Sequence, residues 1–85
     1  MQSREEYTMW IRSQDKKQLV KCTSFSLARN WGGKKKIAIV GSVSNASWWG
    51  KDVVLGLYDT KEIALNELTM LQTELVKNTD LYEMN

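Results

Sequence analysis

Histidine and proline are absent from the 85 residues, and cysteine occurs once, at Cys22. A single thiol cannot form an intrachain disulfide, and one thiol with carboxylates makes a poor zinc site. Without histidine, a Ser-His or Cys-His nucleophile pair is excluded. Most carboxylates fall in the last third of the chain, where a solvent-facing role is a simpler interpretation than acid–base catalysis. We therefore expect a protein that is not an enzyme and has no cofactor, with Cys22 as a small strand residue.

Long apolar runs are also missing from this sequence. No stretch approaches the 18 residues that predict a membrane-spanning helix, and residues 1–8 lack the apolar core of a signal peptide. We therefore expect a cytoplasmic protein with no membrane partner. The length favours one domain, at 9–85, preceded by a short extension at 1–8. Because so small a domain buries a limited core, we expect it to form a homo-oligomer.

Charge is unevenly distributed, although the net charge is only +2. Residues 9–58 carry nine Lys and Arg against two Asp, whereas residues 59–85 carry two Lys against six Asp and Glu. A basic segment followed by an acidic one favours either an anionic partner or association between copies.

Four segments have the composition of strands, at 9–13, 19–28, 36–43 and 52–58. A polar turn at 14–17 separates the first two segments. The apolar run at 53–55 indicates a central strand that is covered on both faces. Short connections between these segments predict an antiparallel meander of about four strands.

One amphipathic helix is predicted after the fourth strand. Asp59 stands three residues before Glu62, which is the spacing of a capping box at a helix start. The helix continues to about Lys77, and its apolar stripe comprises Ala64, Leu65, Leu68, Leu71 and Leu75. Its solvent-facing side is predicted to carry Glu67, Gln72 and Glu74. A fifth, short edge strand is possible at Leu81, Tyr82 and Met84, and the predicted fold class is α+β.

The pattern most suggestive of a binding site lies in residues 9–15. Alternation along a strand places Trp10, Arg12 and Gln14 on one face, opposite Ile11 and Ser13. Tryptophan offers a stacking surface, arginine a planar fork for phosphate, and glutamine an amide that reads base edges. The alternative is that the arginine only lies across the tryptophan on the outer face of the sheet, and the residues favour neither interpretation.

Two turns combine tryptophan, glycine and lysine. The first holds Trp31 and Lys34, and a basic hairpin that discourages edge pairing is the simpler interpretation of it. The second follows Trp48 and contains Trp49 and Lys51. Of two adjacent tryptophans on a strand, one must face away from the protein core, as in an interface or an aromatic ligand site. Thr60 and Lys61 could add a donor and a charge at the positive end of the helix.

Residues 9–15, with the letters MWIRSQD, and 55–65, with the letters LGLYDTKEIAL, resemble short proteins of Gram-positive bacteria, their phages and prophages. The ending at Tyr82, Glu83 and Met84 is similar to theirs, and the resemblance covers most of 9–84. The two tryptophan-glycine turns are particular to this chain. The resemblance implies a small binding protein that blocks a host factor.

Two hypotheses about function follow. In the first, a homo-oligomer sequesters a small anionic nucleotide immune signal, such as a cyclic nucleotide or an NAD derivative, as phage sponge proteins do. Its predicted ligand-binding residues are Trp10, Arg12, Ser13, Gln14, Trp31, Lys34, Trp49, Lys51, Thr60 and Lys61. In the second, the protein inhibits a host protein through an exposed surface that carries a tryptophan. Nucleic-acid binding is less expected, because the helix is acidic and the net charge is small.

Overall fold

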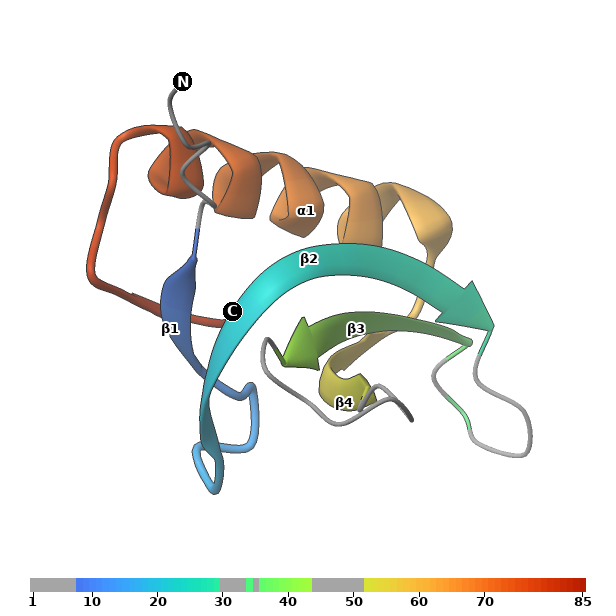
Figure 1. Ribbon diagram of the computed structural model, residues 1–85. Coiled ribbons are helices and arrows are strands. Elements are labelled where there is room, and N and C mark those ends of the chain that lie inside the picture. The colour runs from blue at the N-terminus through green and yellow to red at the C-terminus, as the bar shows by residue number, and fades with distance from the viewer. Residues whose placement is uncertain (1–7, 30–33, 35, 44–51) are drawn as a thin grey trace.

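The computed structural model describes residues 8–29, 34, 36–43 and 52–85 (Figure 1). Its elements, in chain order, are β1 (Met9–Arg12), β2 (Leu19–Arg29), β3 (Ile37–Val43), β4 (Asp52–Tyr58), α1 (Lys61–Val76) and β5 (Leu81–Glu83). The predicted α+β fold, a meander of four strands with one packed helix and a fifth short strand, is confirmed. The predicted extension at 1–8 lies outside the described residues, except for Thr8.

The five strands form one mixed sheet in the order β4-β3-β2-β1-β5. The first four are antiparallel neighbours, and β5 pairs parallel with β1 because α1 carries the chain back across the sheet. The long β2 pairs with β1 along its first part and with β3 along the rest, and it curves strongly (Figure 1). This curl brings the end of β1 close to the edge strand β4, where the Gln14 backbone N–H donates to the Leu55 carbonyl at 2.7 Å.

The core lies between α1 and the face of the sheet that the helix covers (Figure 1). It contains Met9, Ile11, Cys22, Ile39, Leu55, Tyr58, Ala64, Leu71 and Met84. Burial of each large apolar side chain stabilises the fold by about 1.5–3 kcal/mol. Every described strand except the short β5 contributes to this core, and Met84 adds a residue just after β5. The C-terminal segment is therefore part of the domain's packing.

The prediction of a doubly covered central strand at 53–55 is wrong. β4 is an edge strand, and Val54 is 52% exposed. The register of β3 against β4 shifts between Ile39 and Val40, so that β4 has one extra residue there. This bulge lets both Leu55 and Gly56 be buried while Val54 faces out. The consecutive apolar residues therefore reflect a bulge in an edge strand.

Three details of the predicted helix are corrected. The N-cap is Thr60, whose Oγ1 accepts from the Ile63 amide at 3.1 Å, and not Asp59. Leu65, which was assigned to the apolar stripe, is 42% exposed. Glu67, which was assigned to the solvent-facing side, is only 4% exposed. The stripe therefore runs through Glu67 because this residue lies three positions after buried Ala64 and four before buried Leu71.

The end of α1 directs the chain into β5. Asn78 has a φ of 65°, in the left-handed region that ends many helices. Its amide donates to the Leu75 carbonyl, and the Thr79 amide donates to the Glu74 carbonyl, which is the Schellman pattern. The Thr79 hydroxyl also donates to the Glu74 carboxylate at 2.6 Å and lowers the pKa of that group. The chain thus turns sharply and returns beside β1.

Cys22 is a free, fully buried thiol, as expected of a small strand residue. Burial raises its pKa from 9.0 to about 11, so the folded state keeps a proton that the unfolded chain releases. Stability should therefore be fully present below pH 9 and fall as the pH rises toward 11. We also expect iodoacetamide at pH 8 to modify the folded protein at least about 100-fold more slowly than the urea-unfolded chain. Equal rates by mass spectrometry would contradict this burial.

No helix among the described residues is long and apolar enough to cross a membrane. Within the same residues, no three or more side chains of His, Cys, Asp and Glu gather in a way that could hold a metal ion.

Candidate functional site

The outer face of β2, β1 and β5 carries two rows of exposed side chains. Strand register places Lys21, Trp10 and Leu81 in one row, and Leu19, Arg12 and Glu83 in the next. We call these six residues the Trp10 face. All six are exposed, and Leu19, Leu81 and Trp10 are 56%, 48% and 44% exposed. The predicted placement of Trp10 and Arg12 on one face is thus confirmed, and this face is exposed rather than part of the core.

Charged side chains hold one another on the Trp10 face. The Glu83 carboxylate lies 3.3 Å from Lys16 Nζ and 4.0 Å from Arg12 Nη1. Arg12 Nε also donates to the Lys16 carbonyl at 3.3 Å. These exposed contacts add little stability, but they orient the guanidinium along the sheet. A neighbouring carboxylate also makes this arginine a poorer site for a phosphate.

The outer edge of β5 lies beside this face, and some of its backbone hydrogen-bonding groups point away from β1. The Trp10 amide donates to the Asp80 carbonyl, and the Met84 amide donates to the Arg12 carbonyl. In a parallel ladder this pattern engages every second residue of β5, so the backbone groups of Leu81 and Glu83 point away from β1. Among the described residues no strand pairs with that edge.

The opposite edge of the sheet is partly covered by Gln14. Its backbone N–H donates to the Leu55 carbonyl, and its side-chain Oε1 accepts from the Leu57 backbone N–H at 2.9 Å. Gln14 therefore does not continue the outward alternation, because β1 ends at Arg12. Ser13 is buried, and its hydroxyl donates to Asp15 at 2.6 Å and accepts from the Gln18 amide. Both predicted ligand-binding residues thus have structural contacts that the sequence pattern did not reveal.

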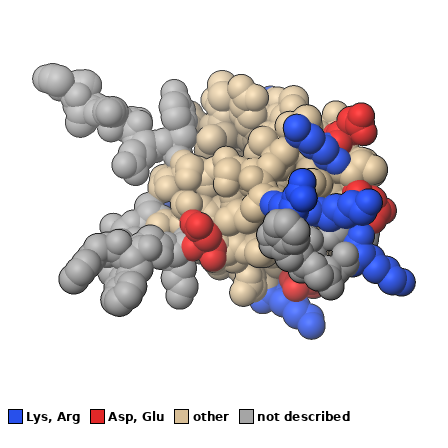
Figure 2. Space-filling view, turned by 90° about the vertical axis from the view of Figure 1, so that its right-hand side faces the viewer, with Lys and Arg blue, Asp and Glu red and all other residues tan. Residues whose placement is uncertain are grey.

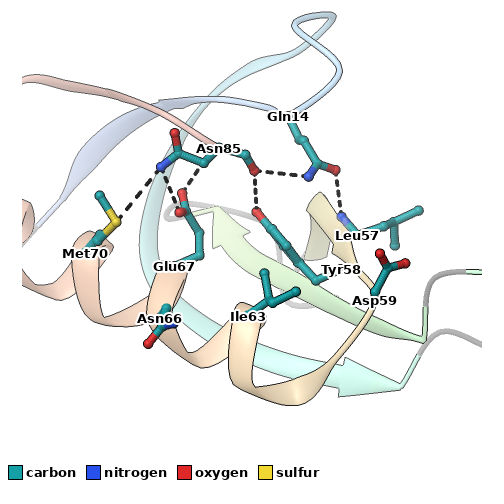
Figure 3. Close-up of a pocket in the computed structure, with 9 residues that line it drawn as sticks. All are labelled: Gln14, Leu57, Tyr58, Asp59, Ile63, Asn66, Glu67, Met70 and Asn85. Carbon is teal, nitrogen blue, oxygen red and sulfur yellow. Dashed lines mark hydrogen bonds between the residues drawn. The ribbon is translucent and has the colours of Figure 1, made fainter.

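A pocket of about 480 Å³ lies between the end of β4, one side of α1 and the last residue, Asn85 (Figure 3). Its apolar walls are Leu57, Tyr58, Ile63 and Met70. Its polar lining is Gln14, Asp59, Asn66, Glu67 and Asn85. Of the predicted ligand-binding residues that the structure describes, only Gln14 lines this pocket.

Glu67 and Asn85 form the centre of a hydrogen-bond network in this pocket (Figure 3). Glu67 Oε2 accepts from Tyr82 Oη at 2.8 Å and from the Asn85 backbone N–H at 3.0 Å. Glu67 Oε1 accepts from the side-chain Nδ2 of Asn85 at 2.9 Å. The Asn85 main-chain oxygen accepts from Gln14 Nε2 at 3.0 Å and from Tyr58 Oη at 3.1 Å. The network thus ties the helix, β4, the turn after β1 and the C-terminal segment together.

The two tyrosines of the network are held in the neutral, donating form. Burial and then the nearby Glu67 carboxylate raise the pKa of Tyr58. Burial and then the hydrogen bond to Glu67 raise the pKa of Tyr82. Because both pKa values lie above their ordinary value of 10.0, the stabilisation that they provide is present at neutral pH and is lost in strong alkali.

Gly56 makes room for the Tyr58 ring, and its substitution should loosen the network. A Cβ at position 56 would lie 2.6 Å from Tyr58 Oη and 3.0 Å from the ring. We expect Gly56→Ala to displace the ring, break the bond to Asn85 and lower the free energy of unfolding by about 1–3 kcal/mol. Val54→Ala, at an exposed position of the same strand, should cost less than about 1 kcal/mol. Equal urea midpoints for the two variants would contradict this role of Gly56.

Among the described residues, the remaining predicted ligand residues do not gather with Arg12. Trp31, Trp49 and Lys51 lie outside the described residues. Lys34 is exposed and follows the end of β2, whereas Arg12 pairs with Leu19 at the start of β2. The 11-residue length of β2 therefore separates the two cations.

Thr60 and Lys61 lie at the start of α1, and the Thr60 hydroxyl is used as the helix cap. Figure 2 shows the end of the molecule at the right of Figure 1, where β2 ends and α1 begins. Lys and Arg side chains gather on one part of this end, with Asp and Glu side chains among them. The mixture of signs weakens the attraction of this surface for an anion.

Sequence reasoning did not identify four residues as parts of a candidate site: Leu81, Glu67, Tyr82 and Asn85. The position of Glu67 between Ala64 and Leu71 could have revealed its burial from helical spacing alone. No sequence signal could have placed Leu81 beside Trp10, since that contact depends on the parallel pairing of distant segments.

Comparisons with protein-family models, with characterised proteins and with solved structures found no match to this chain.

Proposed function

We propose that this protein is a non-enzymatic binding module that engages a partner protein through the Trp10 face. The observation that carries the proposal is a half-exposed tryptophan in register with an exposed leucine, beside a strand edge with which no described strand pairs. Tryptophan and arginine are enriched among the residues that dominate binding energy at protein interfaces. Exposed Trp10, Leu19 and Leu81 alternate with Arg12 and Lys21 across neighbouring strands, so that apolar and cationic side chains share this surface.

The open edge of β5 gives this surface a second means of recognition. An extended segment of a partner can pair with the outward backbone groups of Leu81 and Glu83 and add a strand to the sheet. Since β5 has only three residues, this pairing supplies few hydrogen bonds and the Trp10 face must supply most of the affinity. Beside Leu81 the added strand would favour an apolar side chain, and beside Glu83 a basic one.

The resemblance to small phage and prophage proteins bears on the kind of partner. In that setting the partner is a host protein, and binding in the host cytoplasm would block it and counter host defence. A second copy of this chain is the other occupant that the homo-oligomer prediction allows.

Sequestration of an anionic nucleotide finds less support in the geometry. Of the residues predicted for it, Arg12 and Lys34 lie toward opposite ends of β2. Among the described residues, the pocket beside α1 is lined by two carboxylates and by no Lys or Arg. We expect calorimetry with cyclic dinucleotides and ADP-ribose derivatives to show no heat of binding. Saturable heat with any of them would favour the nucleotide hypothesis instead.

A photo-crosslinking amino acid at Lys21, which is exposed and pairs with Trp10, tests the proposal directly and leaves the tryptophan in place. In Gram-positive bacterial cells it should capture one protein reproducibly, and the purified capture should then bind the unmodified protein. The same amino acid at Val76, which is 66% exposed at the end of α1, serves as the control and should not capture that protein. Capture of another copy of the chain would identify a homo-oligomer. Equal capture from both positions would overturn the proposal.

A further inference from the structure

The pocket beside α1 has the size and walls of a binding site, independently of the Trp10 face. Its volume of about 480 Å³ lies within the range typical of small-molecule sites. Ile63 and Met70 stand one either side of Asn66 along the helix, and they are 48% and 49% exposed. With Leu57 and Tyr58 on β4 opposite them, they form walls suited to an apolar body.

Among the described residues, the charged side chains that line this pocket are both acidic. Glu67 lies at its base and is almost fully buried, while Asp59 lies at the end of β4 and is exposed. The Lys36 backbone N–H donates to the Tyr58 carbonyl, and Lys61 follows Asp59 by two residues, but neither lysine lines the pocket. A carboxylate that is largely removed from water attracts a cation more strongly than an exposed one. The pocket therefore favours a cationic occupant over an anionic one.

Glu67 is oriented by its contacts, and donors from the described residues leave one of its acceptor positions unfilled. A carboxylate offers about four acceptor positions. Tyr82 and Asn85 fill two positions on Oε2 and one on Oε1. Because three donors hold the carboxylate from the C-terminal segment, its remaining lone pair on Oε1 is fixed in place. A donor from an occupant could bind there without rearrangement of the network.

We infer that this pocket binds a primary amine carried on an apolar body, with the ammonium group at Glu67 and the body between Tyr58 and Met70. The same chemistry is offered by a free arylalkyl amine and by a lysine side chain of a polypeptide. The site lies on α1 and β4, apart from the Trp10 face on β1, β2 and β5.

Three probes of similar shape and different charge test this inference: benzylamine, benzyl alcohol and benzoate. Methyl NMR signals of Leu57, Ile63 and Met70 should shift on addition of benzylamine. The dissociation constant for benzylamine should be at least about 10-fold lower than for either other probe. Nα-acetyl-lysine methylamide, which keeps the ε-ammonium group, is added in the same way. Tighter binding of this compound than of benzylamine would indicate a lysine side chain as the occupant, and the reverse would indicate a free arylalkyl amine. Equal binding of benzyl alcohol, tighter binding of benzoate, or no shift at these methyl groups would overturn the inference.

A pair of variants at Met70 locates the site. Met70→Lys places a competing ammonium group at the pocket, at an exposed helix position where lysine is a good helix former. It should lower benzylamine affinity at least about 10-fold, whereas Met70→Leu should keep it within about twofold. Far-ultraviolet circular dichroism shows that both variants are folded. Unchanged affinity in folded Met70→Lys would contradict binding in this pocket.

Discussion

Replacement of Glu67 by leucine is expected to remove about 2–4 kcal/mol of stability. Leucine keeps the volume but leaves the Tyr82 hydroxyl, the Asn85 amide and the Asn85 side chain without their acceptor. Each buried donor that loses its partner costs about 1–3 kcal/mol, less where water can reach it, as at Asn85. A domain of this length has a total stability of about 4–13 kcal/mol. Urea unfolding followed by tryptophan fluorescence measures the change.

Two further variants separate the network from simple packing. Glu67→Gln keeps an acceptor oxygen. Rotation of the Asn85 side-chain amide can turn its oxygen toward the NH₂ group of the new glutamine, so we expect the free energy of unfolding to fall by only about 1 kcal/mol. Tyr82→Phe removes one donor, and in combination with Glu67→Leu it should cost less than the sum of the two single changes. If Glu67→Leu were as stable as the parent protein, the network would not hold the C-terminal segment.

Replacement of Trp10 by alanine is expected to weaken partner binding at least 30-fold while the fold remains. A central interface tryptophan contributes about 2 kcal/mol or more on truncation, which corresponds to roughly that factor. Since Trp10 is 44% exposed in the free protein, its removal should cost about 1 kcal/mol of stability or less. Isothermal calorimetry with the captured partner gives the affinity, and the urea midpoint gives the stability.

Val76→Ala provides the matched control for Trp10. Val76 is a more exposed apolar residue, but it lies at the end of α1 and not on the Trp10 face. Its truncation should leave the affinity within about twofold of the parent protein. A similar loss of affinity for both variants would mean that the Trp10 face is not the binding surface.

The strands and the helix could be predicted from the sequence because their signals are local. Leucine spacing from Leu68 to Leu75 predicted the helix, and alternation predicted that Trp10 and Arg12 share a face opposite Ile11. The sharp turn after β1 was likewise apparent from the polar residues at 14–17, where Lys16 has a φ of 69°. In each case a few neighbouring residues determine the outcome.

The rest depended on contacts between distant segments. Gln14 is drawn inward by the curl of the sheet, which brings β4 to the end of β1. The edge position of β4 follows from the return of the chain to β1 as β5, which no apolar pattern encodes. Glu67 is buried because Tyr82 and Asn85 arrive from the C-terminal segment to bond it. The predicted grouping of Arg12 with Lys34 was not met because the long β2 separates them.

Hydrogen exchange of the protein, alone and bound to the captured partner, tests the role of the Trp10 face most directly. If the partner adds a strand and covers the face, the amides of Leu81 and Glu83 and the indole N–H of Trp10 should exchange at least about 10-fold more slowly in the complex. The residues of α1 should exchange at unchanged rates. Protection confined to α1 and the pocket, with the amides of β5 unaffected, would contradict the account.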